Sequence, residues 1–225
     1  VGSEMCIRDR SYVIEKQFEA HVAHRVHNQC LFNCLRGGET RKDPCKSWHG
    51  HTANFIVRLE SNRLVNEMVL DFNLLNFFKA ALNEHYDHRW TICRDDPLFD
   101  FLVDHAYQCL DGCEEVECAP VKIIDDLDGG EGYRAYTVDI SDEIRNHHGN
   151  VGEPLIELLD SFTIVDFTTT SENLAHWAYN VIDRYLARVC ETTEDEGLRK
   201  ILKNVKVHSV SYKESPKSMA TYQPA

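Results

Sequence analysis

The sequence lacks any run of apolar residues long enough to cross a membrane as a helix, which takes about 20 residues. It also shows no positively charged and then apolar leader of the kind that directs export. Basic residues are scarce, since 24 Lys and Arg stand against 37 Asp and Glu, for a formal net charge of −13. An acidic chain is a poor partner for nucleic acid or for an anionic membrane surface. These absences predict a cytoplasmic protein that binds neither.

No pair of cysteines has the C-x2-C spacing of a zinc knuckle, although the chain has nine cysteines. An odd number without an export signal favours reduced thiols, a metal site or a nucleophile over a disulfide framework. Two groups, Cys30 with Cys34 and Cys109 with Cys113 and Cys118, could hold a second metal. We favour burial on a helix face or chance spacing for them, because they match no common zinc motif.

The rest of the composition is that of a globular protein, with 43% apolar residues in a chain of 225. Residues 1–10 (VGSEMCIRDR) resemble translated sequencing-adapter sequence, so we expect a non-native leader there. Residues 94–165 hold 18 acids and 4 bases, whereas the rest of the chain holds 19 acids and 20 bases. We therefore predict an acidic insertion over 94–165 in a core domain made of 11–93 and 166–225, since such insertions cost little chain entropy.

The spacing of apolar residues predicts an α+β protein. Thr169 and Glu172 have the spacing of a capping box, in which each side chain bonds the backbone N–H of the other residue. A shift of apolar parity between Val207 and Val210 indicates either a β-bulge or a strand that is covered on both faces. The predicted strands are 11–20, 52–60, 121–124, 133–140 and 204–214, and the predicted helices are 74–82, with Asp71 as a cap, 97–110 and 171–189.

The most specific local pattern is Cys45-Lys-Ser-Trp-His49-Gly50-His51, at the start of a predicted strand. Residues i and i+2 of a strand project from one face, so His49 and His51 can offer two imidazoles to one ion. His24, on the preceding predicted strand, could complete a three-histidine site with an open fourth position, as in catalytic zinc sites. An ordinary surface strand would also explain His49 and His51 if they stood alone.

Two further features could carry proton chemistry. Beside a cation, the Cys45 thiol would lose its proton more readily and act as a base or nucleophile, although a ligand or a small buried side chain is also possible for it. Asp87 precedes His88, and a carboxylate that orients an imidazole makes a general acid. A solvated helix end is the alternative for this pair.

Other short motifs stand in a fixed order along the chain: Ala23-His24-Arg25, Met68-Val-Leu-Asp71-Phe72, Asp87-His88, Thr170-Ser171-Glu172-Asn173-Leu174-Ala175 and Lys213-Glu214. Together with the Cys45–His51 pattern, this series resembles the 6-pyruvoyltetrahydropterin synthase / 6-carboxytetrahydropterin synthase family. The four-residue step from Cys45 to His49 resembles the bacterial-type 6-carboxytetrahydropterin synthases.

The resemblance implies the tunnelling fold, a β-β-α-α-β-β unit with an antiparallel sheet and two helices on one face. In this family, trimers close a barrel and two trimers stack into a homohexamer with active sites between subunits. The 94–165 insertion would then lie between the two helices.

The resemblance also implies a role for each matching residue. Zinc would bind His24, His49 and His51, and catalysis would use Cys45, Asp87 and His88. Glu214 would anchor the amino-pyrimidine edge of a pterin through two parallel hydrogen bonds. Thr170, Ser171 and Glu172 would start the second helix beside the pterin, with helix capping as their alternative, and Arg25 and His27 could contact a triphosphate.

The implied reaction converts 7,8-dihydroneopterin triphosphate to 6-carboxy-5,6,7,8-tetrahydropterin, acetaldehyde and triphosphate, a step toward queuosine. One alternative is 6-pyruvoyltetrahydropterin formation by triphosphate elimination. Another is a non-catalytic zinc-binding module. Tyr86, the extra imidazoles His21 and His27, and the insertion depart from the family pattern.

Overall fold

The computed structural model of the chain describes residues 11–29, 43–112, 118–147 and 149–225. The leader expected at 1–10 lies outside these residues, and so do Cys30, Cys34 and Cys113. Within them, none of the helices is both long and apolar enough to span a membrane.

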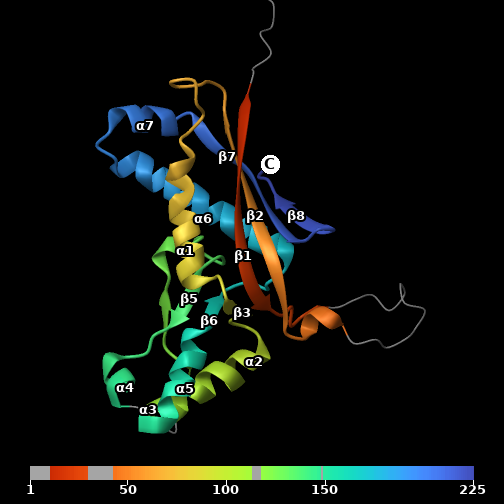
Figure 1. Cartoon of the computed structure of the whole chain (residues 1–225), viewed down its shortest axis with the longest axis vertical. Helices are drawn as coiled ribbons and strands as arrows, with labels where there is room; N and C mark the ends of the chain where they lie inside the picture. The colour runs from red at the N-terminus through yellow and green to blue at the C-terminus, as the bar shows by residue number, and fades with distance from the viewer. Residues whose placement is uncertain (1–10, 30–42, 113–117, 148) are drawn as a thin grey trace, which may run out of the picture.

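One sheet contains the strands β1 (Tyr12–His24), β2 (His49–Ser61), β3 (Arg89–Cys93), β4 (Val121–Ile123), β5 (Ala135–Val138), β6 (Phe162–Val165), β7 (Val205–Ser215) and β8 (Ser218–Tyr222). Their order across the sheet is β4-β5-β6-β3-β1-β2-β7-β8. The helices are α1 (Asn76–His85), α2 (Pro97–Phe99), α3 (His105–Asp111), α4 (Asp142–His147), α5 (Gly149–Asp160), α6 (Ser171–Thr192) and α7 (Glu196–Leu202). Figure 1 shows α1 and α6 on the same side of β1 and β2, with α2 to α5 gathered at one end. The predicted α+β class is confirmed.

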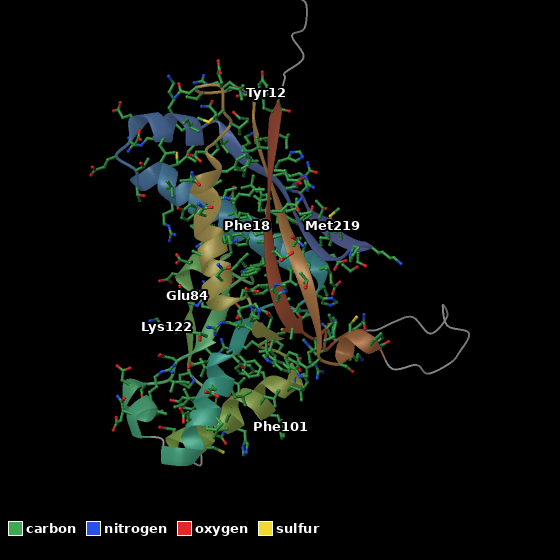
Figure 2. All side chains as sticks on the ribbon, viewed as in Figure 1. Tyr12, Phe18, Glu84, Phe101, Lys122 and Met219 are labelled. Carbon is green, nitrogen blue, oxygen red and sulfur yellow. The ribbon has the colours of Figure 1, made fainter. Side chains whose placement is uncertain are left out.

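Strands β1 and β2 form the centre of the sheet. They pair antiparallel along their whole length, from Tyr12 opposite Ser61 to His24 opposite His49. Alternate side chains of β1 are buried, and Figure 2 shows Phe18 on the side where α1 lies. Its ring lies 5.4 Å from the ring of Phe78 in α1. The alternation read from the sequence therefore becomes one core-facing side on both strands.

The bulge predicted in the 204–214 strand is confirmed. In the pairing of β2 with β7, Arg58 lies opposite Ser209 and Leu59 opposite Val207, so His208 is the extra residue. Val207 and Val210 are both buried as a result. The cap predicted at Asp71 is confirmed too, because its carboxylate accepts a hydrogen bond from Asn73 N at 2.8 Å.

The expected antiparallel pairing is found for β1, β2, β7 and β8, but it does not extend to the whole sheet. β3 runs parallel to both β1 and β6. The start of α1 is fastened near the beginning of β1, where Lys16 Nζ donates to Asn76 Oδ1, and the chain leaves α1 near the end of β1, where His88 N donates to His21 O. It therefore enters β3 already heading in the direction of β1.

Residues 94–165 continue this sheet through β4, β5 and β6. Beside these strands, α2, α3 and α5 enclose a second apolar cluster, which includes Phe99, Val103, Tyr107, Leu159 and Phe162. The segment lies between α1 and α6 in the chain. The elements before it include β1, β2 and α1, and those after it include α6, β7 and β8. The division into a core of 11–93 and 166–225 with an insertion stays a prediction.

Trp177 joins this segment to the main core. Its indole is fully buried in α6, and its Nε1 donates a 3.0 Å hydrogen bond to the carbonyl oxygen of Leu127. Leu127 belongs to the 94–165 segment and is itself fully buried. One side chain thus supplies both apolar contact and a hydrogen bond across the boundary.

We expect Trp177→Phe to lower the free energy of unfolding by about 2 kcal/mol, because it leaves a cavity and removes the donor to a buried carbonyl. Urea unfolding followed by circular dichroism measures the change. Trp90→Phe is the matched control, since Trp90 is 41% exposed. Equal losses in the two variants would contradict this role for Trp177.

Candidate metal centre

Three imidazoles meet where β1 ends and β2 begins. His24 lies directly opposite His49, and Val22, two residues earlier, lies opposite His51. Because alternate residues share a face, all three rings lie on the core-facing side of the two strands. The ring centroids of His24 are 4.7 Å from those of His49 and 5.4 Å from those of His51, and His49 and His51 are 4.9 Å apart.

Glu214 joins this group from β7. It stands two residues after Tyr212, which pairs with Phe55 and is buried in the core, so the two side chains share a face. One ligand atom from each of His24, His49, His51 and Glu214 lies within 4.8 Å of the others, and we call this set the metal group. It is the only set with such geometry in the described part of the chain.

The carboxylate of Glu214 is ionised. Its Oε1 lies 2.9 Å from His51 Nε2 and 3.4 Å from His24 Nε2, and its Oε2 accepts a 2.9 Å hydrogen bond from Ser171 Oγ. A hydrogen bond from His24, which forms when its Nε2 carries a proton, is the main cause that lowers the pKa of Glu214 to about 2, with Ser171 and His51 adding to it against burial.

Backbone carbonyls fix the tautomers of two of the imidazoles. His24 Nδ1 lies 2.8 Å from the carbonyl oxygen of Thr169, and His49 Nδ1 lies 2.8 Å from that of Ser47. A carbonyl only accepts hydrogen bonds, so Nδ1 of each neutral ring carries the proton and Nε2 keeps its lone pair. Burial lowers the pKa of His51, which favours its neutral form as well.

The metal group fits a cation. The Nε2 atoms of His24 and His51 are buried, and both lie close to Glu214 Oε1 without forming a well-aligned hydrogen bond. A lone pair and a carboxylate oxygen face each other favourably only across a proton or a metal ion. Imidazole nitrogens with one carboxylate suit zinc, iron, copper or nickel, and a buried His24 that is already oriented loses little freedom on binding.

Cys45 stands apart from the metal group. It lies in a single 3-10 turn, Pro44–Lys46, just before β2, and its thiol is half-buried. Its carbonyl oxygen accepts a 2.7 Å hydrogen bond from Val26 N, which ties this turn to the chain beyond β1.

Asp87 and His88 lie on the other side of β1. Asp87 Oδ1 accepts a 2.6 Å hydrogen bond from His21 N, and its Oδ2 lies 3.1 Å from His88 Nδ1. Burial raises the pKa of Asp87, but these two interactions outweigh it and hold the pKa below its usual value. His21 is an odd number of residues from His24, so it faces away from the metal group, and the side chain of His88 is 75% exposed.

The capping box predicted at the start of α6, between Thr169 and Glu172, is wrong. Thr170 is the N-cap, and its Oγ1 accepts a 3.3 Å hydrogen bond from Asn173 N. Thr169 is fully buried and donates its hydroxyl to the carbonyl oxygen of Arg25, 2.8 Å away, so it is not free to cap the helix. Glu172 is exposed.

Of the residues predicted for the substrate, Ser171 and Glu214 lie in contact with each other at the metal group. Arg25 is engaged elsewhere, because its Nε lies 3.0 Å from Oδ2 of the buried Asp96. His27 Nδ1 is 3.9 Å from the same oxygen.

Sequence reasoning missed the roles of Thr169 and Asp96. Thr169 was assigned only to a capping box with Glu172. Nothing in the sequence near Asp96 indicates its partner, which lies across the fold in the chain beyond β1.

The proposed second metal at the cysteines receives no support within the described residues. Cys109 and Cys118 are both exposed and belong to no set with ligand geometry there. Cys109 Sγ instead lies 3.9 Å from His105 Nε2, one helical turn away.

The α+β fold brings three histidines and a glutamate together in a group that could hold a metal ion. Residues 13–225 match the family model described as 6-pyruvoyl tetrahydropterin synthase, and the chain belongs to that family. The family resemblance read from the motifs is therefore confirmed. Membership indicates an enzyme of the pterin-synthase type.

The chain is also similar to individual proteins and solved structures. A 6-carboxy-5,6,7,8-tetrahydropterin synthase from Aquifex aeolicus is 32% identical over 97 residues, which cover 41% of this chain and 60% of that protein. The crystal structure of an uncharacterized protein from Wolinella succinogenes is 31% identical, with a TM-score of 0.71 over 96% of this chain and 99% of that one. A Plasmodium vivax 6-pyruvoyltetrahydropterin synthase variant reaches a TM-score of 0.47 at 13% identity over 96% and 99% of the two chains, too low a similarity to support an inference.

We expect the purified protein to retain one zinc ion per chain after dialysis, and His24→Ala, His49→Ala and His51→Ala each to lose it, because each removes one ligand. Elemental analysis of dialysed protein measures the content. His208→Ala is the control, since His208 bonds Glu60 at 3.2 Å on the bulge of β7. Unchanged zinc in all three ligand variants would rule the site out.

Proposed function

We propose that the protein is a zinc-dependent 6-carboxy-5,6,7,8-tetrahydropterin synthase. The observation that carries the proposal is the convergence of three imidazoles and one carboxylate on a single point, with two rings held in the ligating tautomer. The curated relative bears this name, and the Cys45–His49 spacing resembles the same branch. The substrate is 7,8-dihydroneopterin triphosphate, and the product leads toward queuosine in the cytoplasm.

The metal residues are His24, His49 and His51, which leave a position open for the substrate side chain. Zinc bound there would lower the pKa of hydroxyl groups that coordinate it. Glu214, ionised and fixed by Ser171, accepts two parallel N–H bonds from the amino-pyrimidine edge of the pterin. When the pterin binds, the carboxylate of Glu214 forms hydrogen bonds with the pterin in place of its contacts with the imidazoles.

Cys45 removes a carbon-bound proton in this mechanism. Its turn is joined to the end of β1 and directly precedes His49, so the sequence carries base and metal ligands in one short segment. A thiol beside a cation ionises more readily than a free one, which suits it to act near neutral pH.

Asp87 and His88 work on the substrate of a second copy of the chain. Within one chain the ring of His88 lies 5.1 Å from the ring of His21, whose side chain faces away from the metal group, and His88 is exposed. Active sites between the subunits of a homohexamer, as implied for this family, bring an outward imidazole of one copy to the metal group of another.

The charge of the chain does not oppose a triphosphate substrate. Outside 94–165 the residues hold 20 bases and 19 acids, so that part of the chain is close to neutral as a whole. Thr170 and Ser171 begin α6 beside the metal group, where the N-terminal end of a helix favours an anion. In this proposal Arg25 does not bind the phosphates. It supports the metal group through its ion pair with Asp96 and its place in the chain next to His24.

The alternative outcome is 6-pyruvoyltetrahydropterin, formed by triphosphate elimination alone. The same residues would bind the same substrate, so only the products separate the two reactions. A non-catalytic zinc-binding module would leave the substrate unchanged.

Incubation of the zinc-loaded protein with 7,8-dihydroneopterin triphosphate should yield 6-carboxytetrahydropterin and acetaldehyde, because the side chain is cleaved. Mass spectrometry identifies the pterin, and an alcohol dehydrogenase assay measures the acetaldehyde. Pyruvoyl product without acetaldehyde would establish the alternative reaction, and unchanged substrate would refute a synthase.

Cys45→Ala should keep its zinc but lose at least about 100-fold in turnover, the usual scale of a general base. Zinc content and kcat are measured on the same preparation. Cys109→Ala, in an exposed position of the 94–165 segment, is the control and should stay active. A fully active Cys45→Ala variant would remove this residue from the mechanism.

Mixing two inactive variants tests whether the site is shared. Co-assembled Cys45→Ala and His88→Ala chains should recover up to about one quarter of the parent activity, because a quarter of the sites in a random ring combine both intact residues. Each variant alone should stay inactive. No recovery in verified mixed oligomers would place both residues in one chain's site.

A further inference from the structure

One buried residue, Thr169, fastens the metal group to the rest of the protein. Its carbonyl oxygen lies 2.8 Å from His24 Nδ1 and orients that ring. Its hydroxyl donates to the carbonyl oxygen of Arg25 at 2.8 Å, so the same residue also holds the backbone next to His24. Thr169 is fully buried and His24 is 1% exposed, so water does not compete for these bonds.

A buried ion pair extends this connection. Arg25 Nε lies 3.0 Å from Asp96 Oδ2, and the side chain of Asp96 is fully buried. The other oxygen of Asp96 accepts a 2.9 Å hydrogen bond from Leu98 N in the first turn of α2. A buried carboxylate without a partner is unfavourable, so Arg25 and Asp96 hold each other in place.

These contacts hold the chain just beyond the end of β1, where strand pairing no longer fixes it. The pairing of β1 with β2 ends at His24 and His49, so Arg25 is the first residue without a strand partner on that side. Its position is set instead by Thr169 and Asp96. Because His24 is the last residue of β1, the position of its side chain depends on the contacts that fix Arg25.

We propose that Thr169, Arg25 and Asp96 are positioning residues that set the zinc affinity of the metal group, and that Asp96 thereby couples the 94–165 segment to it. The proposal rests on the metal site of the proposed function but on none of its pterin chemistry. Partners of ligating histidines commonly change metal affinity when they are replaced, by about 10- to 100-fold.

The first test compares Thr169→Val with Thr169→Ser. Valine keeps the shape and the backbone carbonyl but cannot bond the carbonyl of Arg25, whereas serine keeps the hydroxyl. Competition with a chromogenic chelator measures the affinity for zinc alone, and thermal unfolding of the metal-free protein measures stability. We expect about tenfold weaker zinc binding in Thr169→Val and parent-like binding in Thr169→Ser.

The second test removes the charge of Asp96. Asp96→Asn keeps a side chain that can cap Leu98 N but leaves Arg25 without its carboxylate, so zinc binding should weaken in the same direction as in Thr169→Val. Because an unpaired buried charge can unfold a protein, the double variant Arg25→Gln/Asp96→Asn supplies a neutral pair, and it should bind zinc less tightly than the parent while remaining folded.

Asp160→Asn is the control, because Asp160 pairs with Arg145 at 2.7 Å in the same segment and contacts none of the three positioning residues. Parent-like affinity in Thr169→Val and in the folded double variant would overturn the proposal, and so would an equal loss in Asp160→Asn. A parent protein that binds no zinc would refute the metal site itself, a result that differs from a bound metal whose affinity ignores these residues.

Discussion

The metal group depends on the register between β1 and β2. Antiparallel pairing places His24 opposite His49, and the alternation of side chains brings His51 to the same face. A slip of one residue would turn every side chain of one strand to the other face and separate the imidazoles. The slip would also expose Phe18 or Phe55, both of which are buried in the core. The apolar residues that fill the core therefore also hold the ligands together.

The part of the fold that could be predicted from the sequence follows from local periodicity. Alternation over β1, β2 and β7, and the 3.6-residue stripe of α6, each report a face that is buried over much of the element. The spacing of His49 and His51 within one strand is equally local. Strands β3 and β6 were missed because they are short and do not alternate, since β6 is buried at every residue and β3 at its last three. The Thr169 hydroxyl bonds the carbonyl oxygen of Arg25 instead of capping α6, and local sequence could not show this because Arg25 is far away in the chain.

The 94–165 segment shows what composition reports and what it omits. Its excess of acids correctly describes an exposed charged surface, but the charge says nothing about the apolar residues between the acids. Ile124, Leu127 and Ala135 enter the main core, and β6 joins β3 at the centre of the extended sheet. Asp96 then reaches the chain beside His24. A segment that reads as an addition to the surface is thus part of the structure that supports the metal group.

The side chain that β7 presents to the candidate site depends on the one extra residue in its bulge. Val207 and Tyr212 are separated by an odd number of residues, yet both are buried, because His208 is the extra residue that restores the alternation. Glu214 follows Tyr212 and contacts the imidazoles from β7. The bulge is a one-residue spacer, and a homologue without it would present a different side chain at this corner of the site.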